Sequence, residues 1–260
     1  MTVDHPEQLV LVERHGQIGV LTINRPEARN AISRAVTVEM ASAIDALEAD
    51  DDVRVIIVTG AGDKAFCAGA DLKSIREGRP TVPELGGFAG ITSRTFVKPV
   101  IAAVNGVALG GGTEICLACD LIVADEHAAI GLPEVRRGIV AAAGGLERLP
   151  RRMPPAVALE LILTGEPITA QRALELGLVN RVSPRGGALA AALDLAGLIC
   201  KGAPLAIQYS KAVVRSSISV GEAEARREHR ALRDRVFRSS DAMEGPRAFA
   251  EKRLPNWSGK

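Results

Sequence analysis

The chain has 260 residues and a mass of 27.3 kDa, which suits one large domain or one domain with a helical extension. Hydrophobic residues make up 47% and charged residues 24%, so bulk disorder is excluded. The formal net charge of +1 excludes a chain-wide binder of polyanions. No apolar run approaches the ~20 residues of a membrane helix, and residues 1–8 lack the apolar stretch of a secretory signal.

The first half of the chain predicts strands alternating with helices. Residues 9–13 and 18–24 are β-rich and flank a His-Gly-Gln turn, which is typical of a hairpin. Residues 30–49 carry apolar side chains at a helical period. Continuous apolar runs predict strands buried on both faces at residues 53–59, 99–104 and 121–124. The alternation indicates a layered α/β domain with parallel pairing.

The second half, from about residue 145, is predicted to be mainly helical. Helices are expected at residues 156–163, 170–176, 188–200, 205–218 and 222–237. The Arg-rich segment 226–238 also contains Glu228 and Asp234. We therefore interpret it as a solvated or subunit-facing helix rather than an RNA-binding patch.

Four cysteines raise the question of a metal or redox site. Cys116 and Cys119 form a C-x-x-C pair, but the pair lies in an apolar stretch and no second pair follows. We expect buried core cysteines in a reducing compartment, and therefore a cytoplasmic protein.

Two glycine-containing loops are candidates for ligand binding. Residues 65–73 read AFCAGADLK, and the small residues at 68–70 let backbone N–H groups approach a ligand closely. Residues 104–114 read VNGVALGGGTE, so three glycines open a helix at its positive end. The Walker and G-x-G-x-x-G patterns are absent from this loop. Either loop alone fits a simple tight turn, but together they could supply two N–H donors to an oxyanion.

Two carboxylates lie in apolar or glycine-rich sequence. Glu114 is on the first turn of the helix after the glycines, and Glu134 follows 20 residues later in IGLPEV. Burial of a carboxyl raises its pKa and suits general acid/base work. Taken singly, each residue is more often a structural or surface glutamate.

Ordered motifs connect these features to a known family. The chain contains AGADLK, NGVALGGGTE, LPE and GGLERLP in this order, together with NRPEARNA, LTG and ALELGLVN. This set resembles the enoyl-CoA hydratase/isomerase (crotonase) family from about residue 9 to the end of the chain. The resemblance implies a crotonase-like spiral of ββα units in an α/β fold. It also implies a catalytic core at residues 1–200 and a C-terminal helical region at 201–260 that forms a homotrimer, commonly paired into a hexamer.

The resemblance also assigns roles to individual residues. The N–H groups of Ala70 and Gly111 would hold the thioester oxygen of an acyl-CoA, and Glu114 and Glu134 match both catalytic glutamates of hydratases. Phe249 and Lys252 resemble residues that contact CoA in a neighbouring subunit. The remaining residues expected to bind CoA or the acyl group are Ala28, Arg29, Ala68, Asp71, Leu72, Lys73, Gly110, Pro133 and Ala142.

The function implied is an enoyl-CoA hydratase, which adds water to a trans-2-enoyl-CoA and gives a 3-hydroxyacyl-CoA. No metal, no cofactor beyond the CoA thioester, no nucleic acid and no membrane partner are expected. Ala141-Ala142 stand where many hydratases have Pro-Gly, which leaves the water geometry or the substrate open. Residues 79–95, where the acyl pocket of the family varies, are expected to be mobile.

Three alternatives remain. The first is an isomerase that shifts a double bond. The second is a specialised acyl-CoA dehydratase. The third is a non-catalytic protein that binds acyl-CoA or RNA.

Overall fold

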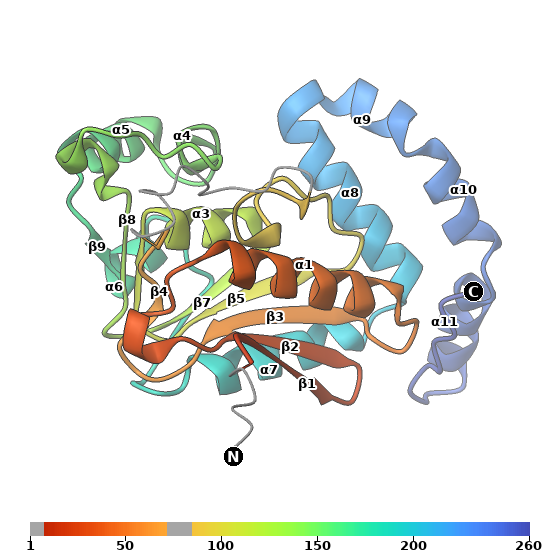
Figure 1. Cartoon of the computed structure of the whole chain (residues 1–260). Helices are drawn as coiled ribbons and strands as arrows, with labels where there is room; N and C mark the ends of the chain where they lie inside the picture. Colours follow the sequence, from red (N-terminus) through yellow and green to blue (C-terminus); the bar gives the residue numbers. More distant parts are fainter. Residues whose placement is uncertain (1–7, 72–84) are drawn as a thin grey trace, which may run out of the picture.

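The main sheet has six strands in the order β1-β2-β3-β5-β7-β10 in the computed structural model, which describes residues 8–71 and 85–260 (Figure 1). β1 and β2 form the predicted antiparallel hairpin, with Val10 opposite Ile23. The other neighbours are parallel, as the buried apolar runs predict. The bounds are β1 Val10–His15, β2 Ile18–Ile23, β3 Val55–Gly60, β5 Val100–Val104, β7 Leu121–Asp125 and β10 Arg181–Ser183.

A second sheet of short strands follows the main sheet. Its order is β4-β6-β8-β9, and its strands are β4 Ala65–Cys67, β6 Val107–Leu109, β8 Ala129–Gly131 and β9 Ile168–Thr169. β4, β6 and β8 each come directly after a strand of the main sheet and are mutually parallel. This repetition is the spiral of ββα units expected from the family resemblance, and the fold class is confirmed.

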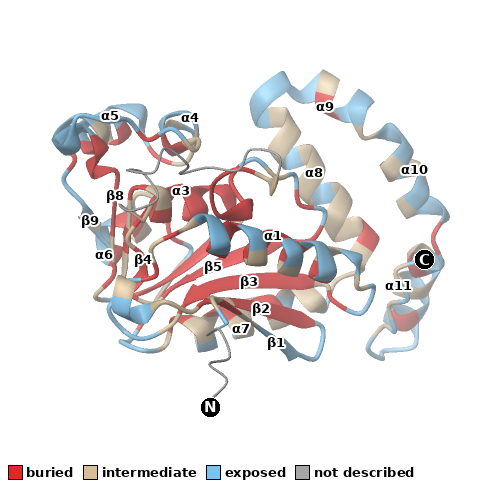
Figure 2. Cartoon of the chain, in the orientation of Figure 1, coloured by how far each residue is buried: buried red, intermediate tan, exposed pale blue. Residues whose placement is uncertain are grey.

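Helices cover both faces of the main sheet (Figures 1 and 2). α1 Arg34–Ala49 begins after Ser33, whose hydroxyl accepts the N–H of Val36, and buries Val36, Met40 and Ile44. α7 Ala188–Cys200 packs its alanines at 188, 192 and 196 against the opposite face. The remaining elements of the core are η1 Pro26–Ala28, η3 Phe88–Gly90, α3 Gly111–Ala118, η4 Pro133–Arg137, α4 Gly145–Arg148, η5 Leu149–Arg151, α5 Pro155–Thr164 and α6 Ala170–Glu175.

The C-terminal helices extend from the core as an arc (Figure 1). They are α8 Pro204–Val220, α9 Glu222–Glu228, α10 Arg230–Arg238 and α11 Ser240–Ala250. The prediction of a single helix for residues 222–237 is wrong, because the helix is interrupted at His229, between α9 and α10. α11 was not predicted from the sequence, since Pro246 lies inside it.

All four cysteines are free thiols, and Cys67, Cys116 and Cys119 are buried as expected. Burial raises the pKa of the Cys67 and Cys119 thiols to about 12. Within residues 8–71 and 85–260, no group of three or more His, Cys, Asp or Glu residues is placed to hold a metal ion.

No single helix in the described part of the chain has both the length and the apolar composition to cross a membrane; α7 and α8 meet these criteria only as a pair, with a 108° bend between them.

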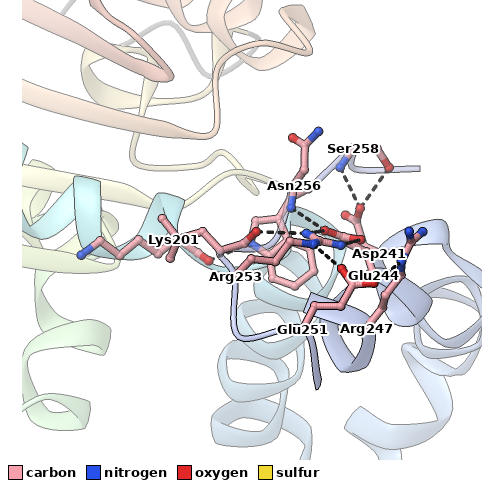
Figure 3. Close-up of polar contacts among 10 residues, drawn as sticks. Lys201, Asp241, Glu244, Arg247, Glu251, Arg253, Asn256 and Ser258 are labelled. Carbon is pink, nitrogen blue, oxygen red and sulfur yellow. Dashed lines mark hydrogen bonds and ion pairs between the residues drawn. The ribbon is translucent and has the colours of Figure 1, made fainter. Parts of the chain in front are cut away.

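Polar contacts attach the last residues of the chain to α11 and to the core (Figure 3). Asp241 accepts the N–H groups of Ser258 and Gly259 at 2.7 and 2.9 Å. The indole N–H of Trp257 donates to the carbonyl of Lys201 at 2.7 Å. Glu244 accepts two hydrogen bonds from Arg253, which lower the pKa of that carboxyl to about 2. These contacts hold α11 beside the junction of α7 and α8.

We expect Asp241→Ala to release this tail, because three donors lose their acceptor. The docked tail should be destabilised by about 1–3 kcal/mol. Trp257 is the single tryptophan, so its fluorescence emission should move to longer wavelength while the helical circular dichroism is retained. Asp234→Ala is the control, since in the described part of the chain the Asp234 side chain forms an ion pair only with the adjacent Arg233. Unchanged emission in Asp241→Ala would contradict the docking.

Candidate active site

Two loops meet at the carboxyl ends of β4 and β6. The strands are parallel neighbours, with Cys67 opposite Ala108. Gly69 has φ +100°, and a Cβ built on it would lie 3.5 Å from the backbone N of Gly111. A Cβ on Gly112 would lie 2.0 Å from the carbonyl oxygen of Cys67. Only glycine allows this close approach, which brings the AGA and GGG segments together.

The backbone N–H groups of Ala70 and Gly111 have no hydrogen-bond acceptor among the described residues. Ile32 pairs with both neighbours of Ala70, since its N–H donates to Gly69 and its carbonyl accepts from Asp71. Gly111 is the first residue of α3, where N–H groups lack an acceptor within the helix. Both N–H groups that the family resemblance assigns to the oxyanion are therefore available to a ligand.

Glu114 lies on the first turn of α3 with only 4% of its surface exposed. Its Oε1 accepts the N–H of Ala143 at 2.6 Å and that of Gly145 at 2.9 Å. Burial raises the pKa of the Glu114 carboxyl, while these two hydrogen bonds and the Arg148 charge oppose the increase. Ala142 is exposed and neither of these donors belongs to it.

Glu134 lies in η4, directly after the buried Pro133. Its Oε2 is buried and has no hydrogen-bond partner in the described chain. Its Oε1 is 3.0 Å from the position that a Cβ on Gly110 would occupy, which places this carboxyl beside the start of α3. Burial, and secondarily the charge of Glu114, raise the pKa of Glu134. The charge of Glu114 therefore reaches the carboxyl of Glu134.

Phe88 forms part of the site but was not identified from the sequence. Its ring lies against Gly111, so that a Cβ on Gly111 would be 2.4 Å from a ring atom. Residues 88–92 are buried, and Arg94 ties this loop to α1 through the carbonyl of Ala41 and the side chain of Asp45. The expected mobility of residues 79–95 stays a prediction, and residues 79–84 lie outside the described chain.

The residues expected on the CoA side are partly brought together. The N–H of Ala68 donates to the carbonyl of Arg29, which joins the turn at residues 28–29 to the AGA loop. Asp71 forms an ion pair with Arg25 at 3.0 Å. Leu72 and Lys73 lie outside the described residues.

Asn30 organises the start of this region and was not assigned a role from the sequence. It is fully buried, its side-chain oxygen accepts the N–H of Arg25, and its amide nitrogen donates to the carbonyls of Ala61 and Ala65. A buried amide that uses both ends fixes the turn before α1 relative to β4. In the sequence, this role could have been suspected only from an asparagine that lies shortly after Arg25-Pro26.

Phe249 and Lys252 are not brought to the site of their own chain. Phe249 is 86% exposed at the end of α11, and Figure 1 shows α11 across the molecule from α3 and α4. Their expected contribution to a neighbouring subunit stays a proposal.

Comparisons with known proteins identify the family of the chain. The profile of the family described as Enoyl-CoA hydratase/isomerase matches residues 13–260. This chain belongs to the enoyl-CoA hydratase/isomerase family. A carnitinyl-CoA dehydratase of Proteus mirabilis is 42% identical over 252 residues, which cover 94% of this chain and 96% of that protein.

Solved structures of the family are similar throughout the chain. An enoyl-CoA hydratase from Mycobacterium tuberculosis is 48% identical, with a TM-score of 0.93, and the match covers 98% of this chain and 100% of that one. A carnitinyl-CoA hydratase from Mycobacterium avium is also 48% identical, with a TM-score of 0.79 and the same coverage. These names differ in substrate while sharing the family.

Gly110→Ala should impair the site without unfolding the protein. Gly110 has φ +56° and the added methyl group would press on Oε1 of Glu134. Displacing this carboxyl should lower turnover of an acyl-CoA substrate by ~10²-fold, measured by steady-state kinetics.

The control is Gly197→Ala, in the interior of α7, where an added Cβ meets nothing within 4 Å. It should leave turnover unchanged and raise helix stability by up to about 1 kcal/mol. Equal turnover in the two variants would contradict the placement of Glu134 beside Gly110.

Proposed function

We propose that this protein is a hydro-lyase that adds water to the double bond of a trans-2-enoyl-CoA, and removes it in the reverse direction. The observation that carries the proposal is the presence of two buried carboxyls, Glu114 and Glu134, beside the available N–H groups of Ala70 and Gly111. No metal or redox cofactor is proposed.

In this proposal the two N–H groups bind the thioester oxygen of the substrate. Their hydrogen bonds withdraw electrons from the conjugated system, make the β-carbon electrophilic and stabilise the enolate that forms when water attacks. One donor of this kind typically contributes roughly 2.7–4 kcal/mol to transition-state stabilisation. The ring of Phe88 against Gly111 keeps this side of the site apolar, which strengthens such hydrogen bonds.

The surroundings of the two carboxyls support different roles. Glu114 accepts two N–H groups and lies near the Arg148 charge, which favour its ionised form. Glu134 has a buried oxygen without a partner and faces the charge of Glu114, which favour its protonated form. We propose that Glu114 accepts a proton from the attacking water and that Glu134 delivers a proton to the α-carbon.

Glu114→Gln and Glu134→Gln should each reduce hydration by ~10²–10⁴-fold. The loss of absorbance of the conjugated thioester measures this activity. The double variant should be little worse than either single one, because both groups act on one water. Affinity for a CoA thioester should survive, since Gln is close in shape to Glu.

The same assay separates the alternatives. A wild-type protein that only moves the double bond of a 3-enoyl-CoA would favour the isomerase. Binding of CoA thioesters without either reaction would favour the non-catalytic protein.

A second candidate is dehydration of carnitinyl-CoA, which the names of several curated relatives favour. Carnitine carries a trimethylammonium group, which proteins commonly bind with aromatic rings. Among the described residues of the site, Phe88 is the aromatic one, and its ring packs on Gly111. We therefore propose an uncharged acyl group as the substrate.

The comparison of two substrates tests this choice. We expect kcat/KM for an uncharged 3-hydroxyacyl-CoA of four carbons to exceed that for carnitinyl-CoA by at least ~10-fold, the effect of about 1.4 kcal/mol in transition-state binding. A preference for carnitinyl-CoA would assign the specialised dehydratase instead.

We also propose that the chain acts as a homotrimer or hexamer in the cytoplasm. Large apolar side chains exposed on the C-terminal helices support the assembly: Val214, Ile218, Phe237 and Met243.

A further inference from the structure

We propose that Arg148 is a positioning residue. It fixes the base Glu114 relative to the loop at residues 88–92, whose Phe88 ring lies on the oxyanion donor Gly111. The inference rests on the proposed hydro-lyase function for its catalytic consequence, while its structural part is independent of that function. Arg148 ends α4 and is half-buried.

The first contact of Arg148 orients the donors to Glu114. Nη1 donates to the carbonyl of Ala143 at 2.9 Å, and the N–H of the same residue donates to Oε1 of Glu114. Gly144 has φ +99°, and a Cβ on it would lie 2.0 Å from Nη1. The guanidinium therefore packs directly on the backbone of the segment that holds the carboxylate.

The second contact reaches the loop over the oxyanion site. Nη2 donates to the carbonyl of Thr92 at 2.5 Å, across 56 residues of sequence. The hydroxyl of Thr92 accepts the N–H of Phe88 at 2.9 Å, and the ring of Phe88 lies on Gly111. One side chain thus connects the support of Glu114 to the residue that covers the oxyanion donor.

The charge of Arg148 adds to this geometry. It lowers the pKa of Glu114, against the effects of burial and of Glu147. Burial and the nearby Arg215 and Arg151 lower the pKa of Arg148 itself, but a guanidinium stays charged at neutral pH. The other carboxyl that interacts with Glu114 is Glu134, whose pKa the charge of Glu114 raises and that of Arg137 lowers.

A lysine cannot make both contacts in the same way. The planar fork of arginine presents two nitrogens in a fixed geometry to two carbonyls on separate loops, whereas an ammonium is a single point. Arg148→Lys should therefore retain the positive charge but lose the fixed link between the two loops. Arg148→Met should lose both the charge and the link.

The test compares these variants with wild type and with Arg151→Met, which removes an exposed charge three residues away. Among the described residues, the Arg151 side chain forms a hydrogen bond only with Ser219. We expect kcat for hydration to fall ~10–100-fold in Arg148→Met, with less effect on KM. The acidic limb of the pH profile of kcat/KM should move to higher pH, because the base Glu114 must be ionised and loses a stabilising positive charge. Arg148→Lys should lower kcat with a smaller movement of the limb.

Amide hydrogen exchange supplies a readout that does not depend on catalysis. Exchange should increase together in peptides covering residues 141–148 and 86–94 of Arg148→Met, and in neither for Arg151→Met. If both regions stay protected and kcat and the acidic limb are unchanged, the positioning role is overturned. If the acidic limb moves equally in Arg151→Met, the shift comes from the loss of any nearby positive charge, and the specific role of Arg148 is contradicted. If wild type hydrates no enoyl-CoA but the coupled exchange occurs, the proposed function fails and the structural link stands.

Discussion

The close approach of the loops after β4 and β6 is the constraint on which the site depends. A helix that starts against the carbonyl of Cys67 leaves no room for a side chain at residue 112, and the first free N–H groups of α3 consequently lie beside the AGA loop. The parallel pairing of two strands only three residues long is sufficient, because the main sheet beneath them fixes their direction. The same helix start carries Glu114, so one packing contact positions both the N–H groups that we propose as oxyanion donors and one of the two carboxyls that we propose as acid/base groups.

The second constraint is the unequal treatment of two carboxyls buried near each other. Burial raises the pKa of both carboxyls, and the charge of Glu114 raises the pKa of Glu134 further. The protein supplies two backbone donors and a guanidinium to Glu114, and leaves an oxygen of Glu134 without a partner. Different surroundings of this kind can let one of two carboxyls act as a base and the other as an acid at the same pH.

Much of this could be predicted from the sequence. Strands β3, β5 and β7 followed from continuous apolar runs, which are typical of strands buried on both faces, and β1 and β2 followed from a hairpin pattern. β4, β6 and β8 are too short to show a period, although the second sheet that they form carries the site. The break at His229 was missed, and so was α11, because a proline inside a helix disfavours it and the contacts of Asp241 with the tail that hold α11 are not visible in the local sequence.

In the site too, residues within local sequence motifs were predicted, whereas contacts between distant segments were not. Ala70, Gly111, Glu114 and Glu134 belong to ordered motifs and were expected, and the structure brings their elements together. Arg148 and Phe88 were not expected as parts of one network, because the bond from Arg148 to Thr92 joins segments that are distant in sequence and uses a backbone carbonyl. Because every residue has a backbone carbonyl, the residue type does not show which carbonyl accepts such a bond.

The proposed difference in ionisation between Glu114 and Glu134 is tested most directly by following carboxyl protonation in the free protein. Infrared difference spectroscopy across a pH titration would record the two coupled protonation steps in wild type and in the Gln variants. The account predicts that the carboxyl signal that persists to higher pH is lost in Glu134→Gln and retained in Glu114→Gln. Loss of that signal in Glu114→Gln, with retention in Glu134→Gln, would contradict the assignment of Glu134 as the acid and Glu114 as the base.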